Sequence, residues 1–302
     1  MGLDYSRVLN QLKVGYDVIG RGKKSAEIFK SESNYHVITG GVEKILQNDK
    51  VDVDTAIVTV GAENLTNVSC LLLENGFKRL LVEKPGGLNI EEICKLEKMA
   101  KSKNAQVFIA YNRRFYSSTI KAKEIIKKDG GVTSFNFEFT EFAHKIKSVK
   151  KHSLIKENWF IANSTHVIDL AIFLGGYPCK YSTFTKGGLS WHPSASIFSG
   201  AGITDHQALF SYSANWEAPG RWGVEVLTRK HRLIFRPLEK LKIQKIDSFE
   251  RLCVSIDDKL DIKYKPGIYE QTKAFLSNNN SNLCSIDEHK NNFEFYSKII
   301  HP

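Results

Sequence analysis

A lysine that follows a short apolar run is the residue best placed to do chemistry in this sequence. Lys84 belongs to the motif Glu-Lys-Pro-Gly-Gly at residues 83–87, directly after the run Arg79–Val82. Such a run is typical of a strand covered on both faces of a parallel sheet, and ligands bind at the carboxyl ends of those strands. A lysine there can donate a hydrogen bond to a substrate hydroxyl that is losing a hydride and a proton. Because a lysine after a strand is more often a surface residue, the position alone leaves both interpretations open.

A histidine in the second half of the chain is the candidate for moving that proton. His166 lies in the segment Asn163–Leu170, which leads to Leu-Gly-Gly-Tyr-Pro at residues 174–178. The ordinary histidine pKa of about 6.5 allows it to accept a proton near neutral pH. Just upstream, Asn158 and Trp159 are candidates to line a sugar pocket, since an indole face stacks on the apolar side of a pyranose. A plain core role for Trp159 is equally open.

The amino-terminal region carries part of a dinucleotide-binding pattern. A complete Gly-x-Gly-x-x-Gly is absent from the sequence, but Gly2 precedes a helix-like segment, Tyr5–Leu12, as the third glycine of that fingerprint does. We therefore expect the sequence to begin inside the fingerprint, without the first strand and the first two glycines. An ordinary short leader before a helix is the alternative. Val60 and Gly61, at the end of a later strand-like run, are assigned to the same cofactor.

The turn after the run Tyr16–Ile19 favours NADP over NAD. It reads Gly-Arg-Gly-Lys-Lys at residues 20–24, with Arg21 at its tip and no carboxylate. An NAD site ordinarily has Asp or Glu there to bind the ribose hydroxyls, whereas Arg accommodates a 2′-phosphate. NADP is therefore the expected cofactor and NAD the second choice. A basic surface turn is the alternative interpretation.

Predicted strands and helices alternate along the first part of the chain and position these residues. Roughly the first 115 residues alternate between short β-branched runs and amphipathic helices, and repeating β-α units predict a doubly wound parallel sheet, a Rossmann-like domain. The expected strands are Tyr16–Ile19, His36–Ile38, Ala56–Val60, Arg79–Val82 and Val107–Ala110, and the expected helices are Tyr5–Leu12, Ser25–Lys30, Val42–Gln47, Leu65–Glu74 and Ile90–Lys101.

The second half of the chain changes character. After a helix expected over Ser117–Lys128, apolar and polar residues alternate with a period of two, as in strands with one buried face. The alternating runs are Phe135–Phe139, Phe210–Trp216 and Trp222–Val226, followed by a hairpin strand ending at Phe235 and a helix over Ile268–Leu276. The sequence thus predicts two domains: a Rossmann-like α/β domain over 1–116 that lacks its first strand, and an α+β domain with a large open antiparallel sheet over 117–302.

Composition narrows the class of protein. The chain has 302 residues, of which 42% are hydrophobic and 25% charged, which excludes a disordered protein. No apolar run approaches the roughly 20 residues that span a bilayer, and the start lacks a secretion signal, so we expect no membrane partner and a cytoplasmic location. The net charge of +10 comes from dispersed basic residues without a recognition helix, so nucleic acid is not an expected partner. Two explanations of the positive charge remain: a solvated basic face, or a site for anionic substrates.

The sequence lacks the motifs of metal sites, of common hydrolases and of NTPases. The five cysteines are scattered without a Cys-x-x-Cys, and His192, His206 and His231 lie far apart with no carboxylate at metal-ligand spacing, so no metal is expected. The absence of a Gly-x-Ser-x-Gly element and of a P-loop removes the common hydrolase and NTPase classes.

Three motifs, taken in order, resemble those of the Gfo/Idh/MocA family, the relatives of glucose–fructose oxidoreductase and inositol dehydrogenase. They are Glu-Lys-Pro at 83–85, Tyr-Asn-Arg-Arg-Phe at 111–115 and the His166 segment with its Gly-Tyr-Pro end at 176–178. The resemblance covers most of the chain. It implies that Lys84 binds or polarises the reacting hydroxyl and that His166 faces the nicotinamide and accepts the proton. Glu83, Lys84 and Asn112 are assigned to cofactor contacts as well.

One position departs from the family's pattern. Many members carry an Asp four residues before the histidine, and here that residue is Ala162, with Asn163 beside it. Asp169 matches a later acid of the motif, which we expect to cap or brace the helix rather than to react.

The resemblance implies an oxidoreductase that transfers a hydride between NADP(H) or NAD(H) and a secondary hydroxyl or carbonyl of a sugar, cyclitol or nucleotide sugar. Two alternatives are a non-catalytic sugar- or dinucleotide-binding module on the same scaffold and an amino-terminally incomplete chain of an ordinary enzyme. In the family such sheets pack face to face, so we expect a homodimer or homotetramer. The alternating aromatic residues of Phe135–Phe139 and Phe210–Trp216 would suit that contact.

Overall fold

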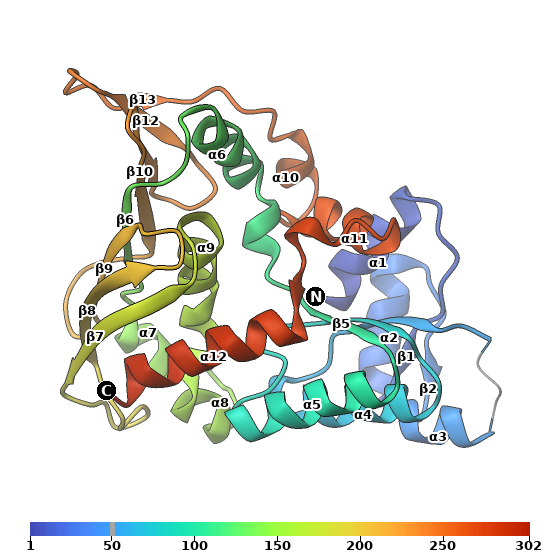
Figure 1. Cartoon of the computed structure of the whole chain (residues 1–302). Helices are drawn as coiled ribbons and strands as arrows, with labels where there is room; N and C mark the ends of the chain where they lie inside the picture. The colour runs from blue at the N-terminus through green and yellow to red at the C-terminus, as the bar shows by residue number, and fades with distance from the viewer. Residues whose placement is uncertain (49–51) are drawn as a thin grey trace. The chain divides into compact units, whose positions relative to one another are not determined.

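The computed structural model describes residues 1–48 and 52–302, and the chain divides into two compact units (Figure 1). The first unit comprises Met1–Ala110 and Leu260–Asp287, and the second comprises Tyr111–Lys259 and Glu288–Pro302. A single boundary after residue 116 does not describe this division, because the segment Leu260–Asp287 returns to the amino-terminal unit.

The first unit contains parallel β-strands connected by helices. Its larger sheet has the order β14-β5-β4-β3, with β3, β4 and β5 parallel and β14 antiparallel to β5. A separate parallel pair, β1-β2, is not hydrogen-bonded to that sheet. The strands are β1 (Ile19–Gly20), β2 (Ile38–Thr39), β3 (Thr55–Val58), β4 (Arg79–Val82), β5 (Gln106–Ile109) and β14 (Cys284–Ser285).

The split between the two parallel sheets has a clear topological meaning. In the Rossmann strand order 3-2-1-4-5-6, the first strand lies between strands 2 and 4. Here β1 and β3 hold those flanking places, and no strand lies between them in residues 1–48 and 52–302. All four residues of β4 are buried, whereas three of the four residues of β3 are only half-buried, as expected for a strand with one unpaired edge.

Helices connect the strands of the first unit as the sequence pattern predicts. The helix α5 begins where the Asn89 side chain accepts a hydrogen bond from the Glu92 backbone N–H at 2.9 Å, which satisfies one of the free donors of its first turn. The helices are α1 (Gly2–Gln11), α2 (Lys23–Ser33), α3 (Val42–Asn48), α4 (Leu65–Glu74), α5 (Ile90–Ser102), α10 (Lys259–Lys263) and α11 (Ile268–Leu276), with 3-10 turns at Ala62–Asn64 and Asn280–Asn282.

An eight-stranded sheet forms the second unit, in the order β13-β12-β11-β10-β6-β9-β8-β7. The prediction of an antiparallel sheet is correct for every pair except one, because β6 and β9 run parallel. Parallel neighbours need a long crossover, and the segment between these strands supplies it. The strands are β6 (Ser134–Glu138), β7 (Pro178–Lys186), β8 (Ile197–Thr204), β9 (Leu209–Asn215), β10 (Gly223–Leu227), β11 (His231–Phe235), β12 (Lys242–Lys245) and β13 (Leu252–Cys253).

One face of this sheet is covered by helices. The side chains of Phe135 and Phe137 are each 2% exposed. A Cβ atom added at Gly175, the end of α9 (Thr165–Gly175), would collide with the Phe135 ring, so this helix lies directly on the sheet. The ring of Phe295 on α12 (Ile286–Ile300) packs edge-on against Phe210 at 5.9 Å. The expectation that these aromatic residues serve a contact between sheets of two copies is therefore wrong: they face inward.

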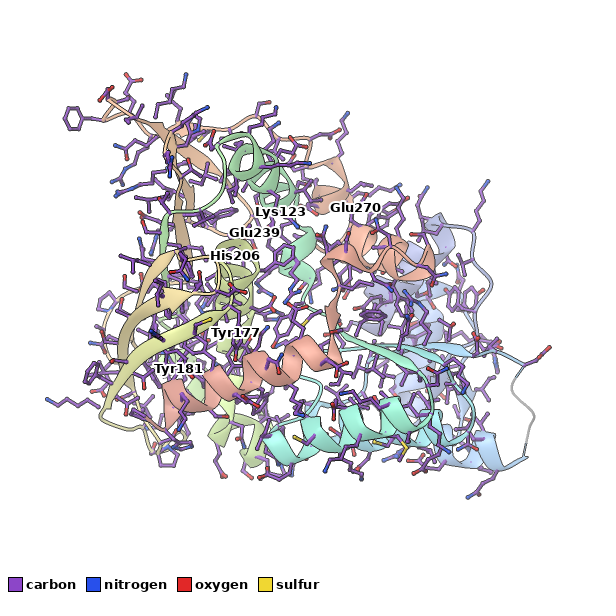
Figure 2. The ribbon with its side chains drawn as sticks, in the orientation of Figure 1. Lys123, Tyr177, Tyr181, His206, Glu239 and Glu270 are labelled. Carbon is purple, nitrogen blue, oxygen red and sulfur yellow. The ribbon has the colours of Figure 1, made fainter. Side chains whose placement is uncertain are left out.

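The opposite face of the sheet is open. Small and polar side chains of β6, β8 and β9 cover it, including Asn136, Ser199 and Ser211, and the Phe184 side chain is 67% exposed. At the edge of the sheet, Tyr177 and Tyr181 lie beside α12 (Figure 2). The Tyr177 hydroxyl donates to the Asn291 carbonyl at 3.1 Å, so the residue that precedes β7 is attached to this helix.

Short helices fill the remaining connections of the second unit. They are a 3-10 helix at Asn112–Phe115, α6 (Ser117–Lys128), α7 (Ala143–Ser148), α8 (Ser153–Glu157) and a π-helical turn, Phe160–Ser164, that leads into α9. In the described part of the chain, every helix falls short of the length and apolar character that a membrane span requires.

Candidate active site

The predicted lysine follows the most buried strand of the first unit. Glu83 and Lys84 come directly after β4, and Lys84 is half-buried. The Tyr5 hydroxyl of α1 donates a hydrogen bond to Glu83 at 2.9 Å. Burial raises the pKa of Glu83, while the Tyr5 hydrogen bond and the charge of Lys84 act in the opposite direction. The first turn of α1 therefore lies at the carboxyl end of β4, where ligands bind in sheets of this kind.

The start of α1 also lies next to the end of β3. A Cβ atom built on Gly2 would be 3.5 Å from the hydroxyl of Thr59, the residue before Val60 and Gly61. The first turn of a helix carries backbone N–H groups without intrahelical partners and a partial positive charge, and both favour a diphosphate. Four predicted cofactor contacts, Gly2, Val60, Gly61 and Glu83, thus border one end of the parallel sheet, and these residues fit a dinucleotide.

Arg21 has a partner that the sequence pattern did not predict. Its guanidinium lies 2.8 Å from the carboxylate of Glu43, on α3, and both side chains are exposed. An exposed ion pair contributes little stability, about 0–1 kcal/mol, so a bound phosphate can replace it. Residues 20–24 contain no carboxylate, but Glu43 brings one to this turn from α3.

His166 lies on α9 of the second unit, in an aromatic environment. Ten of the eleven residues of α9 are buried, and His166 is 8% exposed. The ring of Tyr111 meets the imidazole edge-on at a centroid distance of 6.0 Å, and the ring of Trp222 lies at 6.2 Å. The histidine is therefore held by packing on two sides, which fixes the direction of its ring nitrogens.

One turn further along α9, a buried ion pair attaches the helix to the 3-10 turn after β5. Arg114 donates to both carboxylate oxygens of Asp169, at 2.9 and 2.6 Å, and also to Glu288 at 2.7 Å. Burial raises the pKa of Asp169 to about 6, against the charge and hydrogen bonds of Arg114. The negative charge of Glu288 acts in the same direction as burial, because two carboxylates share one guanidinium. Asp169 braces the helix, as its place in the motif predicts.

A buried glutamate lies beside the segment where the family often has an aspartate. Glu141 is 3% exposed and accepts hydrogen bonds from Asn163 at 2.9 Å and from the Ser164 hydroxyl at 2.8 Å. Burial raises the pKa of Glu141, although these hydrogen bonds and the charge of Arg221 act in the opposite direction. The turn that contains Ala162 is thus supplied with a carboxylate from another part of the chain, which no local pattern could reveal.

Asn112, Asn158 and Trp159 were predicted to contact cofactor or substrate, and the structure gives each a local setting. Asn112 is 5% exposed, and its side-chain oxygen accepts a weak hydrogen bond from Arg113 at 3.4 Å. The amide of Asn158 donates to the Leu154 carbonyl at the end of α8. Trp159 packs edge-on against Trp191 at 6.3 Å. Their predicted roles in ligand binding stay predictions.

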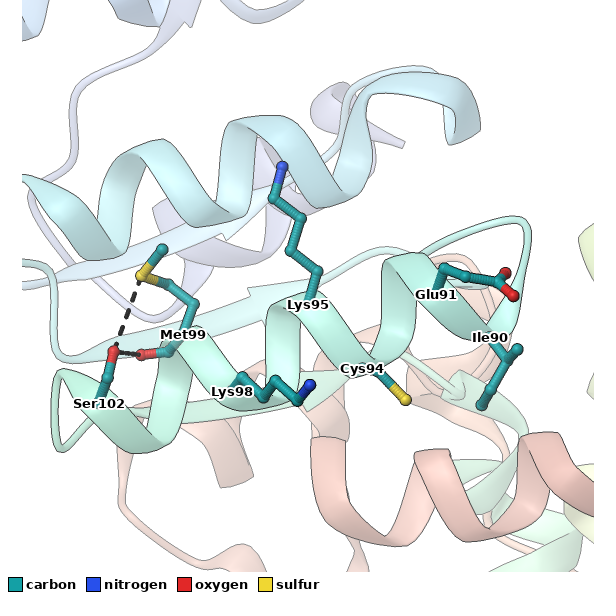
Figure 3. Close-up of a pocket in the computed structure, with 7 residues that line it drawn as sticks. All are labelled: Ile90, Glu91, Cys94, Lys95, Lys98, Met99 and Ser102. Atoms are coloured by element: carbon teal, nitrogen blue, oxygen red, sulfur yellow. Dashed lines mark hydrogen bonds between the residues drawn. The ribbon is translucent and has the colours of Figure 1, made fainter.

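Two surface hollows lie away from these residues. One runs along an exposed face of α5, from Ile90 to Ser102, where Lys95 and Lys98 project (Figure 3). It is lined by this helix alone and contains none of the predicted site residues. The second hollow lies on the open face of the eight-stranded sheet, around Phe184. In the described residues, no group of three or more His, Cys, Asp or Glu side chains could hold a metal ion.

The fold is typical of one class of protein, the two-domain oxidoreductases with a Rossmann-like dinucleotide-binding unit. Residues 9–111 match the sequence model of the Gfo/Idh/MocA family, described as an oxidoreductase family with an NAD-binding Rossmann fold. The matched segment contains the Glu-Lys-Pro motif, and over this part the chain resembles the family. A comparison with curated protein sequences finds no match.

Solved structures share the fold of the whole chain at low sequence identity. Levoglucosan dehydrogenase, in a complex with NADH and levoglucosan, is 17% identical with a TM-score of 0.80, and the alignment covers 99% of this chain and 93% of that one. The UDP-N-acetylglucosamine 3-dehydrogenase GnnA from Acidithiobacillus ferrooxidans is 14% identical with a TM-score of 0.75, over 99% and 93% of the two chains. An NAD-binding oxidoreductase from Klebsiella pneumoniae is 13% identical with a TM-score of 0.76, over 98% and 90%.

Proposed function

We propose that this protein transfers a hydride between NADP(H) or NAD(H) and a secondary hydroxyl or carbonyl of a sugar, a cyclitol or a nucleotide sugar. The observation that carries this proposal is the place of Lys84, directly after the fully buried strand β4 of a family-matched Rossmann domain. Levoglucosan dehydrogenase and the UDP-sugar dehydrogenase, which share the fold, support a carbohydrate substrate.

Each catalytic residue has a distinct task in this proposal. Bound NAD(P) supplies the hydride acceptor or donor. The Lys84 ammonium donates a hydrogen bond to the reacting oxygen and stabilises the negative charge that develops there. The His166 imidazole accepts the hydroxyl proton during oxidation and returns it during reduction. Packing against Tyr111 and Trp222 keeps the imidazole in position for this transfer.

For the cofactor, we propose a preference for NADP(H). Arg21, followed by Lys23 and Lys24 at the start of α2, offers charge-assisted hydrogen bonds to a 2′-phosphate. The carboxylate of Glu43, 2.8 Å from Arg21, is the feature that keeps NAD(H) usable, because a carboxylate at this tip can accept ribose hydroxyl hydrogen bonds.

The open face of the eight-stranded sheet supports a homodimer or homotetramer. Phe184 is 67% exposed on this face among small side chains, which allow a second sheet to approach closely. The five cysteines are free thiols, which fits the reducing cytoplasm that we propose as the location.

A substrate panel tests the proposed activity. The purified chain is incubated with NADP⁺ or NAD⁺ and a set of sugars, cyclitols, sugar phosphates and nucleotide sugars, and the absorbance of the reduced nicotinamide is followed. Turnover of at least one member, lost on Lys84→Ala, supports the proposal. Tight binding of a sugar or dinucleotide without any turnover would instead favour a non-catalytic binding module, the alternative that Ala162 in place of an aspartate favours.

A further inference from the structure

Two arginines stack on one tryptophan beside His166. The guanidinium carbon of Arg113 lies 5.0 Å from the centre of the Trp222 ring, and that of Arg221 lies 4.5 Å from it. The Trp222 ring in turn lies 6.2 Å from the imidazole of His166. Stacked guanidiniums have a restricted orientation, so their N–H groups are already arranged to bind a ligand.

The hydrogen-bond donors of this cluster are incompletely used. The Nε atom of Arg113 and the Nε1 atom of Trp222 are both buried, and neither has an acceptor within the described residues. Trp222 is 6% exposed. A buried N–H group without an acceptor is destabilising, because it loses its hydrogen bond to water without a replacement. Two such donors in one cluster therefore point to an acceptor that the chain itself does not provide.

The ion pair of the cluster is made by Arg221 and not by Arg113. Its buried carboxylate, Glu141, lies 3.4 Å from Arg221, and its other oxygen accepts from Asn163 and Ser164. Arg113 forms no ion pair within the described residues. Burial lowers the pKa of Arg113 and the charge of Arg221 acts in the same direction, whereas Tyr116, Glu239 and Glu141 act in the opposite direction. The Arg113 guanidinium can therefore bind an external anion beside the proposed proton acceptor.

From this cluster we infer that the substrate carries an oxyanion, a carboxylate or a phosphate group, which Arg113, Arg221 and the Trp222 indole N–H bind beside His166. The inference rests on the proposed function in one respect, namely that the bound anion is part of the substrate. The binding site itself is defined by residues of the second unit alone. A planar guanidinium binds two oxygens of a carboxylate or phosphate at once, which selects such groups over neutral hydroxyls. The site thus adds a substrate preference to the proposed reaction.

Binding measurements test the inference without turnover. Isothermal titration compares glucose with three anionic probes: glucuronate, glucose 1-phosphate and UDP-glucose. We expect at least one anionic probe to bind about tenfold or more tightly than glucose, since hydrogen bonds to charged groups are the strong ones. Comparison of the three probes distinguishes a carboxylate, a phosphate and a diphosphate as the group recognised. Equal affinity for glucose and all three anionic probes would overturn the inference.

Substitutions of the two arginines test whether the anionic probe binds at this cluster. Arg113→Gln is expected to remove the advantage of the anionic probe while the affinity for glucose stays the same, and Arg221→Gln is expected to reduce that advantage. The matched control is Arg232→Gln, which removes the same charge from an arginine of β11 that pairs with Glu225. An equal loss in this control would assign the effect to the overall charge and would overturn the site.

Further outcomes distinguish a substrate site from a cofactor site. If Arg113→Gln does not fold, Trp222→Phe removes one donor while retaining an aromatic ring, and it must also weaken anion binding. If Arg113→Gln weakens NADP⁺ binding and leaves the sugar probes unaffected, the anion belongs to the cofactor and the inference fails. Turnover of neutral sugars with no preference for anionic probes would overturn the proposed anion site but would leave the proposed hydride transfer unaffected. Selective anion binding without turnover of any probe would support the site and count against the reaction.

Discussion

Arg114 donates hydrogen bonds to both carboxylate oxygens of Asp169, although neither residue has contact with bulk solvent: the arginine is 1% exposed and the aspartate 0%. The pair joins the 3-10 turn after β5 to α9, one turn beyond His166. Breaking a buried pair by removing one partner typically costs about 3–5 kcal/mol, because an unpaired charge is left behind. The position of the histidine thus depends on this ion pair.

The stability of the protein should depend on the titration of Asp169. Its pKa in the folded protein is raised from 3.8 to about 6, so the folded state binds more protons than the unfolded state between these values. This contribution to stability is fully present below pH 3.8 and is lost as pH rises through 6, so the free energy of unfolding falls over that interval. Urea unfolding from pH 4 to 7 should show this slope in the wild type and a smaller slope in Asp169→Asn, because Glu83 and Glu141 keep their own raised pKa values.

Glu288→Gln provides the matched control for that experiment. Removing the second carboxylate from Arg114 takes away one cause of the raised pKa of Asp169. The pH window in which stability falls should therefore move to lower pH. An unchanged slope in Asp169→Asn would assign the dependence to another group.

Lys84→Ala should abolish turnover and leave the fold intact. The lysine follows β4 and is half-buried, so its loss removes a donor to the reacting oxygen without opening the core. We expect the rate to fall by about 10²–10⁴-fold with little change in melting temperature. Lys98→Ala, on the exposed face of α5, is the control and should retain full activity (Figure 3). Retention of more than about a third of the wild-type rate by Lys84→Ala would remove the lysine from the mechanism.

His166→Ala should slow the reaction and flatten its pH dependence. If the imidazole moves the proton, the wild-type rate of oxidation rises with a group that titrates at about pH 6–8, and the variant lacks this rise. The exposed His206, labelled in Figure 2, gives the matched control His206→Ala, which should retain the wild-type profile. A wild-type profile that is flat over this range would argue against proton transfer by His166.

Ala162→Asp restores the residue that many family members have and is a companion to the histidine test. We expect a higher rate, because the added carboxylate can orient the imidazole or stabilise its charged form. Ala162 is 9% exposed and Glu141 already lies beside its neighbours Asn163 and Ser164, so the variant should also be less stable. A lower rate in a fully folded variant would contradict this expectation.

Arg21 and Glu43 should change cofactor preference in opposite directions. Arg21→Ala removes a charge-assisted hydrogen bond to the 2′-phosphate, so the preference for NADP(H) should fall by about tenfold or more. Glu43→Gln frees Arg21 from its 2.8 Å ion pair and removes a negative charge, so that preference should rise. Titration of each variant with both cofactors measures the ratio of the two Kd values. Tight NAD binding that is indifferent to Arg21 would refute the assignment.

The open sheet face gives a test of assembly. Phe184→Glu places a charge at the most exposed aromatic position of this face, and two such charges at a contact between copies repel each other. Light scattering should show a smaller species for this variant than for the wild type. Phe249→Glu, in a loop outside this face, is the control, since Phe249 is 99% exposed. A wild-type chain that is already monomeric would disprove the proposed homo-oligomer.

The first and last residues of some helices and strands could be predicted from the sequence. The predicted limits of β4, α4, α6 and α11 coincide with those in the structure. By contrast, the first predicted strand, Tyr16–Ile19, shrinks to Ile19–Gly20, because it pairs only with the two residues of β2 and has no strand on its other side within the described residues. The parallel pairing of β6 with β9 was not predictable, since alternation shows which residues face inward but not which strand lies alongside.

Candidate site residues could be proposed from the sequence only where motifs are contiguous. Lys84 and His166 stand in such motifs, and the ion pair of Asp169 agrees with its predicted bracing role. The stacking of Arg113 and Arg221 on Trp222 joins segments that are distant in sequence, and no local period encodes it. Consecutive arginines even point to different partners, Arg113 to Trp222 and Arg114 to Asp169, which residue type alone does not distinguish.

The return of Leu260–Asp287 to the amino-terminal unit determines when that unit can finish folding on the ribosome. The guanidinium of Arg79, on β4, donates to the Phe275 carbonyl at 2.9 Å and to Asn280 at 2.7 Å, and Ser285 pairs with Phe108 on β5. Domains ordinarily fold as units in the order of their synthesis. Here the first unit cannot form these contacts until residues 260–287 have been synthesised. Until then, the hydrogen bonds that Arg79 makes with this segment are absent and one edge of β5 is unpaired.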